Sequence, residues 1–187
     1  MVLASHNPHK AAELTRLLDG FEIEPYAGSM PPETGSTFLE NALIKARHVH
    51  RLVGAGLWVV ADDSGIMAAA LGGAPGVYSA RFAGAGADDA ANLQKLLDDL
   101  AGHHDRRVSY VAELVAVDPE GREIHGRGEL RGTLADSPRG GGGFGYDPAF
   151  IPEGEVRTVG EMSAAEKDAI SHRARAADAL QRAIQAL

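Results

Sequence analysis

The sequence predicts an α/β fold in which helices flank a mixed β-sheet. Apolar or alternating segments typical of strands are interleaved with segments that repeat apolar residues every three or four positions, as amphipathic helices do. Residues 108–117 and 122–134 are strong strand patterns separated only by an Asp-Pro-Glu-Gly turn, which indicates an antiparallel hairpin. Alternating strands and helices, together with one hairpin, favour a sheet with both parallel and antiparallel pairs.

Composition excludes several classes of function. The chain has 187 residues, enough for one domain with a sizeable core, and it has no cysteine for disulfides, thiolate zinc sites or nucleophiles. Its formal net charge of −8 argues against nucleic-acid and anionic-membrane partners, because both require a positive field. No apolar run is long enough to cross a membrane, and the N-terminus lacks a secretory pattern. We therefore expect a single cytoplasmic domain over residues 1–187.

The N-terminal segment reads as a strand followed by a helix. Residues 1–5 are a short apolar run typical of a buried strand, and Asn7 can cap a helix whose first turn accommodates Pro8. The helical spacing of apolar residues continues up to Gly20. Residues 21–26 then alternate apolar and acidic side chains, which predicts a second strand.

A second helix and a buried strand follow. Thr37 with Glu40 three residues later is a capping box, and the amphipathic pattern predicts a helix to about Leu52. Residues 57–61 are a continuous apolar strand that we expect to end at the polar sequence 62–65. Beyond it, residues 88–100 carry leucines on one face of a further helix.

The C-terminal segment is predicted to be helical. Ser163 and Glu166 form a second capping box, and the helical pattern runs over residues 167–187 with a break near Ser171.

The sequence Asp62-Asp63-Ser64-Gly65 is the strongest local candidate for a functional site. In α/β sheets ligands gather beyond the carboxyl ends of strands, and two adjacent carboxylates there repel each other unless a cation such as Mg²⁺ is bound. Asp-Ser-Gly is also favourable turn chemistry, so a solvated turn is the alternative interpretation.

The segment from Ser5 to Lys10 has the features of an anion site. A strand ends where a helix begins, so free backbone N–H groups, the Ser5 hydroxyl, Asn7 and Lys10 gather at a helix N-terminus. The chain has no Gly-Lys-Ser/Thr sequence, so it is not a P-loop protein. His6 and His9 lack a third metal ligand nearby, which favours surface or supporting roles.

A glycine-rich segment over residues 140–145 formally matches a dinucleotide-binding pattern. We exclude that interpretation, because Pro148 and Pro152 prevent the helix that should follow. Instead, the loop can approach a ligand closely, with Phe144 or Tyr146 offering a ring for a nucleobase to stack on. The alternative is a flexible surface loop with its aromatic rings in the core.

Lysine is rare in this chain. Only four of its 18 basic residues are lysines, and those retained are candidates for phosphate contacts, with chance retention as the alternative. Near Lys167, the side chains of His172 and Arg173 offer mainly hydrogen-bond donors, although they could equally form an ordinary polar helix face.

In this order, the motifs resemble the inosine triphosphatase family, pyrophosphatases that cleave non-standard purine nucleoside triphosphates. The resemblance covers nearly the whole chain and is carried by residues 5–10, 33–35, 38–42 with Lys45, 61–65, 72–81, 143–148, 164–167 and 171–173. One position departs from the family, which usually has glycine where this chain has His6.

The resemblance implies an activity and an architecture. The activity is Mg²⁺-dependent hydrolysis of ITP, dITP or XTP to the monophosphate and pyrophosphate by a homodimer. The architecture is an elongated mixed sheet flanked by helices, with two lobes and a central substrate cleft. Two alternatives stay open: a house-cleaning pyrophosphatase for pyrimidine or other modified nucleotides, and a nucleotide-binding module without turnover.

The resemblance also assigns roles to residues. It implies that Asp63 is the general base and shares metal binding with Glu33, while Asp62 supports the site. The implied substrate-binding residues are Ser5, His6, Asn7, Pro8, His9, Lys10, Lys45, Ser64, Phe144, Gly145, Tyr146, Asp147, Lys167, His172 and Arg173.

Overall fold

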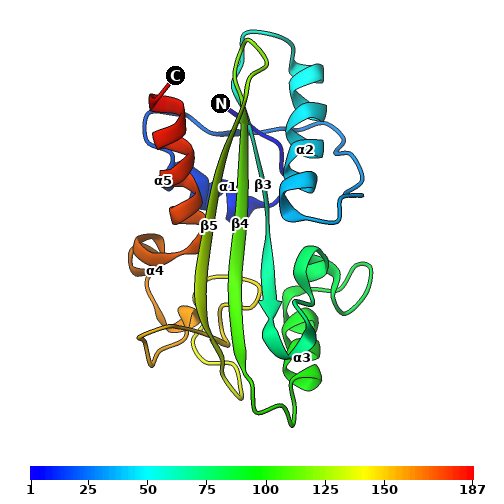
Figure 1. The fold of residues 1–187 in the computed structure, drawn as a ribbon, viewed down its shortest axis with the longest axis vertical. Helices are drawn as coiled ribbons and strands as arrows, with labels where there is room; N and C mark the ends of the chain where they lie inside the picture. Colours follow the sequence, from blue (N-terminus) through cyan, green and yellow to red (C-terminus); the bar gives the residue numbers. More distant parts are fainter. The chain divides into compact units, whose positions relative to one another are not determined.

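The computed structural model describes all 187 residues and contains one six-stranded sheet in the order β2-β1-β3-β4-β5-β6 (Figure 1). The strands are β1 (Val2–Leu3), β2 (Glu24–Pro25), β3 (Val59–Ala68), β4 (Arg107–Val117), β5 (Glu123–Leu134) and β6 (Phe150–Pro152). Strand β1 pairs in parallel with β2 and β3, whereas β5 and β6 are antiparallel. The mixed α/β sheet predicted from the sequence is therefore confirmed.

Five α-helices and three short 3₁₀ helices accompany the sheet. They are α1 (Pro8–Leu17), α2 (Phe38–Val53), α3 (Asp89–Asp99), α4 (Ala164–Ile170), α5 (His172–Gln185), η1 (Ala69–Leu71), η2 (Gly76–Arg81) and η3 (Val159–Glu161). None of these helices is long and apolar enough to cross a bilayer.

The chain divides into two compact units. The first unit comprises Met1–Asp63, Ala112–Gly128 and His172–Leu187, and the second comprises Ser64–Val111 and Glu129–Ser171. Strands β3, β4 and β5 each supply residues to both units.

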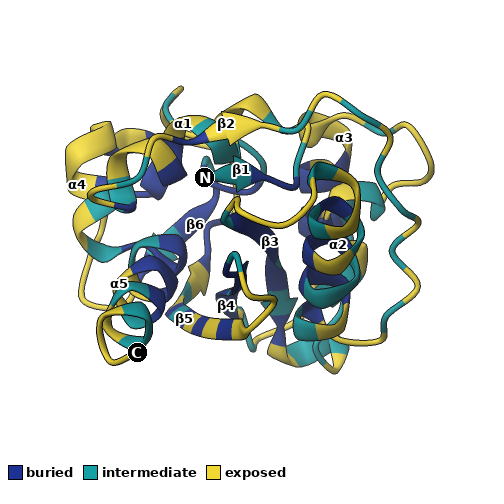
Figure 2. Cartoon of the chain, turned by 90° about the horizontal axis from the view of Figure 1, so that it is seen from above, coloured by how far each residue is buried: buried dark blue, intermediate teal, exposed yellow.

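In the first unit, helices cover both faces of the sheet. Val60 of β3 packs with α1 and α5 in one apolar cluster, while Val59 and Ala61 pack with α2 in another. Successive strand residues point to opposite faces, so these two clusters lie on opposite faces of the sheet. In Figure 2, buried residues form stripes along α2 and α5, whose outer surfaces are exposed.

The second unit has a separate core. Leucines on one face of α3 pack against Ile66 of β3, Val108 and Tyr110 of β4, and Phe150 of β6. The rings of Tyr110 and Phe150 stack with their centroids 4.5 Å apart. Tyr146 and Ala149, from the loop that follows β5, also pack in this core and anchor that loop.

Two sequence-based boundaries are wrong. Strand β3 was expected to end at Ala61 but continues to Ala68, because cationic side chains neutralise its two aspartates and the sheet pairing is retained. The strand predicted over residues 21–26 is reduced to Glu24–Pro25, where Pro25 has no N–H to donate to a ladder. The predicted helix break near Ser171 is confirmed, since α4 ends at Ile170 and α5 starts at His172.

Candidate active site

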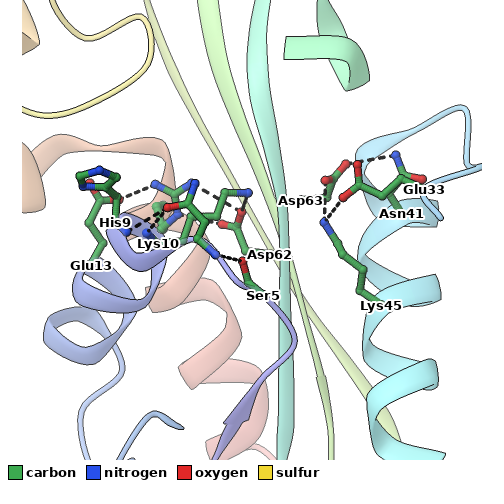
Figure 3. A network of polar contacts seen from close by, with 11 residues as sticks. Ser5, His9, Lys10, Glu13, Glu33, Asn41, Lys45, Asp62 and Asp63 are labelled. Carbon is green, nitrogen blue, oxygen red and sulfur yellow. Dashed lines mark hydrogen bonds and ion pairs between the residues drawn. The ribbon is translucent and has the colours of Figure 1, made fainter. Parts of the chain in front are cut away.

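Two adjacent carboxylates of β3 point to opposite faces of the sheet (Figure 3). Asp62 has the same strand parity as Val60 and therefore faces α1 and α5. Asp63 has the parity of Ala61 and faces α2. Both carboxylates are buried. The strand thus creates two separate polar clusters from neighbouring residues.

The cluster around Asp62 is an ion-pair network. The Arg173 Nε atom donates to Asp62 Oδ2 at 2.8 Å, and its Nη1 atom donates to Glu13 on α1. The Lys10 ammonium also pairs with Asp62. Arg173 is only 1% exposed. Through these ion pairs, its guanidinium links α5 to α1 and β3 inside the first unit. The sequence predicted a nucleobase contact for Arg173; the structure adds this internal role.

The cluster around Asp63 links β3 to α2 and to the loop before it. The Lys45 ammonium lies 2.8 Å from Asp63 Oδ1 and 2.7 Å from Glu33 Oε1. Asn41, one helical turn before Lys45, donates from its amide to Asp63 Oδ2 at 3.3 Å. The Asn41 amide oxygen accepts the Gly35 N–H at 2.8 Å. Both oxygens of Asp63 are thereby oriented.

Burial and ion pairing shift the two aspartates differently. Burial alone raises the pKa of Asp62, but Arg173 and Lys10 together hold it well below its usual value. Burial raises the pKa of Asp63, and the attraction of Lys45 and Lys10 offsets only part of that rise. The Lys10 ammonium has a lowered pKa because of burial, despite its proximity to Asp62. Asp63 is therefore the better proton acceptor of the two.

The predicted anion segment forms a capped helix start. Asn7 Oδ1 accepts the N–H groups of His9 and Lys10 at 2.9 and 3.2 Å, and Ser5 Oγ accepts the Asn7 N–H at 3.1 Å. Pro8 occupies the first turn of α1. The cap therefore already occupies two of the backbone donors that the sequence assigned to a phosphate.

The side chain of His6 is exposed and hydrogen-bonds across to the loop that carries Glu33. Its Nε2 atom lies 2.8 Å from the Gly28 carbonyl oxygen. His48 on α2 makes a similar contact with the neighbouring Ser29 carbonyl, at 3.1 Å. His6 therefore connects two loops of the first unit.

The second unit holds the predicted nucleobase residues 144–147 and Lys167, whereas His172 and Arg173 belong to the first unit. Asp147 Oδ2 accepts hydrogen bonds from the Lys167 ammonium at 2.7 Å and the Phe144 N–H at 2.8 Å. The Lys167 Nζ atom lies 4.5 Å from the centre of the Phe144 ring, a cation–π geometry. Phe144 is half-buried, so its ring is the better candidate for stacking on a base.

Tyr146 is part of the core rather than an open stacking surface. Its side chain is 5% exposed, and its hydroxyl donates to the Ser79 carbonyl oxygen at 2.7 Å. Gly145 and Ser64 are partly buried. No helix follows residues 140–145, in agreement with the exclusion of a dinucleotide site.

The sequence analysis did not identify Glu13 and Asn41, two residues of these clusters. Glu13 and Asn41 are polar residues on the buried faces of α1 and α2, beside Leu14 and Ala42. A polar residue interrupting an apolar helix stripe was the signal that could have revealed both. His172 is buried at the start of α5.

The site contains no group of three or more His, Cys, Asp or Glu side chains arranged to hold a metal ion. Glu33 and Asp63 nevertheless converge on one cation, the Lys45 ammonium. Proteins commonly bind Mg²⁺ through one or two carboxylates together with substrate phosphates. The donor set of these two residues therefore fits Mg²⁺ bound together with a phosphorylated ligand.

Comparison with known proteins identifies similar sequences and structures. Residues 1–183 match the Ham1 family. The dITP/XTP pyrophosphatase of Ralstonia nicotianae is 51% identical, with 94% of this chain and 92% of that protein covered. The dITP/XTP pyrophosphatase of Mycobacterium tuberculosis is 46% identical, with 100% and 96% covered. The structure of a HAM1 protein from Coxiella burnetii superposes with a TM-score of 0.88 at 40% identity, covering 100% and 98%.

Proposed function

This chain is a member of the Ham1 family, as the resemblance in its motifs predicted, and from that premise we propose that it hydrolyses dITP, XTP and ITP. The products are the nucleoside monophosphate and pyrophosphate, so the reaction removes non-standard purine nucleotides from the pool. Besides the family, the main support is Asp63, a buried carboxylate with a raised pKa held between Lys45 and Asn41.

Asp63 is the proposed general base. A water molecule beside its carboxylate loses a proton to it and attacks the α-phosphorus, while the bond between that phosphorus and the bridging oxygen to the β-phosphate breaks. The electron pair of that bond leaves with pyrophosphate. The raised pKa brings the base closer to neutral pH, and the contacts from Lys45 and Asn41 fix the direction of its lone pairs.

Glu33 and Asp63 would hold the Mg²⁺ that we propose as cofactor. When bound, the ion supplies charge neutralisation for the triphosphate. The Lys45 ammonium pairs with both carboxylates in this structure. With Mg²⁺ held by Glu33 and Asp63, the Lys45 ammonium would instead pair with a phosphate oxygen of the substrate.

The proposed phosphate contacts resolve an apparent conflict with the acidic composition. A triphosphate approaching a protein of net charge −8 needs local positive charge. Lys10 and Lys45 supply it in the first unit. One ammonium–phosphate pair at about 4 Å is worth on the order of 4 kcal/mol at an effective dielectric constant of 20.

For the nucleobase we propose the Phe144 ring as stacking partner and donor groups as readers of the 6-oxo oxygen. Lys167, His172 and Arg173 are the donors. Adenine carries a 6-amino donor, so it would leave donors facing donors and be rejected. An Arg173→Lys variant keeps the charge beside Asp62 but has fewer donors and a weaker link to Glu13, so urea unfolding must first show that it is folded. Its preference for ITP over ATP should fall, and an unchanged preference would contradict this assignment.

We also propose a homodimer located in the cytoplasm. The dimer is what the resemblance to the inosine triphosphatase family implies, and the absence of cysteine suits a reducing compartment. Light scattering coupled to gel filtration measures the oligomeric state directly, and a monomer would contradict the proposal.

A substrate panel tests the function. The purified protein is incubated with Mg²⁺ and each of dITP, XTP, ITP, ATP, GTP and a set of pyrimidine nucleotides, and phosphate and pyrophosphate are detected separately. We expect pyrophosphate from the first three only. Pyrophosphate chiefly from pyrimidine or other modified nucleotides would favour the alternative house-cleaning role, and no turnover with Mg²⁺ present would favour a binding module.

A further inference from the structure

A carboxylate outside every motif named above contacts the nucleobase loop, which we define as residues 143–147. Asp89 is the first residue of α3, and its Oδ2 atom accepts the Gly145 N–H at 2.8 Å. Asp89 belongs to the same compact unit as the loop but lies 56 residues earlier in the chain. The contact therefore joins the start of α3 to the backbone of the loop.

The preceding amide of the loop is held by another carboxylate. The Phe144 N–H donates to Asp147 Oδ2 at 2.8 Å, and that buried carboxylate is itself bound by Lys167 and by the Tyr110 hydroxyl. Asp147 thus anchors the loop from the core. Asp89, which is exposed, anchors it from the solvent side.

Together these two contacts fix the backbone around Phe144. The N–H groups of Phe144 and Gly145 belong to the two peptide planes that flank the Phe144 Cα atom. A peptide group is rigid and planar, so holding both planes sets the φ and ψ angles of Phe144 and the direction of its side chain. Gly143 and Gly145 have φ angles of +71° and +62°, a backbone without intrinsic preference for a single conformation.

We propose that Asp89 is a positioning residue for nucleotide binding, because it sets the orientation of the Phe144 ring through the Gly145 amide. The inference rests on the proposed function, in which that ring stacks on the base. Asp89 acts on the loop backbone and does not touch the reacting phosphates. Its loss should therefore weaken nucleotide binding and leave the chemical step intact.

The neighbouring residue provides a matched control. Asp88 is the N-cap of α3, and its side chain accepts the Ala91 N–H at 2.8 Å. Asp88→Ala removes one carboxylate from the same helix end without a contact to the loop. Asp89→Asn keeps an oxygen that can accept the Gly145 N–H. The set Asp88→Ala, Asp89→Ala and Asp89→Asn separates loop positioning from helix stability.

Steady-state kinetics with dITP form the first readout. For Asp89→Ala we expect KM to rise about three- to tenfold with kcat within about twofold of wild type, the scale of one lost charge-assisted hydrogen bond at an exposed site. Asp89→Asn should restore most of the affinity. Asp88→Ala should lower the melting temperature and leave KM unchanged. Equal KM values in Asp88→Ala and Asp89→Ala, or a fall in kcat alone, would overturn the proposal.

Hydrogen exchange gives a readout that does not require turnover. Backbone exchange of a peptide covering the nucleobase loop should be faster in Asp89→Ala than in wild type or Asp88→Ala. Unchanged exchange in Asp89→Ala would overturn the positioning role. If wild type released no pyrophosphate from dITP, the proposed function would fail, and the exchange comparison would still decide whether Asp89 holds the loop.

Discussion

Asp62 and Asp63 are successive residues of β3, yet their pKa values move in opposite directions. The strand alternation places Asp62 against two cations, Arg173 and Lys10, and places Asp63 against Lys45 near the carboxylate of Glu33. When two carboxyl groups have environments that separate their pKa values, their chemical roles separate too. Asp62 stays ionised as an organising charge, whereas Asp63 is able to exchange a proton.

Replacement of Asp63 by Asn should abolish turnover without unfolding the protein. Asn preserves the volume of the side chain but removes the proton acceptor and one charge from the proposed metal site. We expect kcat to fall by about 10²- to 10⁴-fold. Pyrophosphate release measures the activity, and a cooperative urea transition shows that the variant is folded. Normal turnover would move the base to another residue, with Glu33 or Glu40 as the next candidates.

Arg173→Met should strongly destabilise the first unit. The substitution removes the guanidinium that pairs with the buried carboxylates of both Asp62 and Glu13. Breaking a buried ion pair by removing one partner costs about 3–5 kcal/mol. Arg182→Met on the same helix is the control, because Arg182 pairs with Asp178 at the surface and its loss should cost less than about 1 kcal/mol. Urea unfolding compares the two, and equal costs would refute the structural role of Arg173.

Removal of the Lys45 ammonium should make the stability of the protein depend on Mg²⁺. In Lys45→Met the carboxylates of Glu33 and Asp63 lose their shared cation, at a cost on the order of 3 kcal/mol in metal-free buffer. Mg²⁺ should then raise the melting temperature of the variant more than that of wild type, because binding to the native state alone is stabilising. Lys95→Met, which removes a surface pair with Asp99, should show no such difference. Equal responses to Mg²⁺ would argue against metal binding at this carboxylate pair.

Gly65→Ala tests how closely β3 packs in the second unit. A Cβ atom at Gly65 would lie 2.3 Å from Ser79 Oγ and 2.7 Å from the Gly76 carbonyl oxygen. Ser79 Oγ also accepts the Ile66 N–H, so it is held in place. Overpacking of this kind costs about 1–3 kcal/mol. Gly141→Ala, where a Cβ meets no atom within 4 Å, should change stability by less than about 0.5 kcal/mol.

Glu166 makes the stability of α4 sensitive to acid. The Ser163 backbone amide, Arg157 and the Ser163 hydroxyl lower the pKa of Glu166 from 4.5 to about 2. Because the folded state has the lower pKa, this stabilisation is present above pH 4.5 and is lost as the pH falls toward 2. Glu166→Gln should therefore lower the melting temperature at pH 6 and reduce its dependence on pH between 5 and 3. Parallel pH curves for variant and wild type would contradict this prediction.

The sequence predicted which segments form helices and strands better than the residues at which those segments begin and end. Caps at Thr37 and Ser163 are local chemistry, and both capping boxes are present in the structure. The end of β3 depended on distant cations that neutralise its aspartates, which no local pattern contains. Strand β6 is three residues long and its pairing with β5 is likewise non-local.

In the candidate site too, the sequence indicated individual residues but not their long-range partners. Lys10 and Lys45 could be selected from the sequence because lysine is rare in this chain. Which carboxylate each of them meets depends on the parity of β3 and on the helices that cover each face. The contacts of Glu13 with Arg173 and of Asn41 with Asp63 likewise depend on which helix covers which face of the sheet.

The position of the Asn41 amide limits how substitutions can alter the metal preference of the proposed site. Its two ends hold Asp63 and the Gly35 backbone in the loop that carries Glu33, so one side chain spans both proposed metal ligands. A substitution that adapts one ligand to a different ion disturbs the other through this amide. Metal preference in this protein is therefore a coupled trait, and libraries designed to alter it should vary Glu33, Asn41 and Asp63 together.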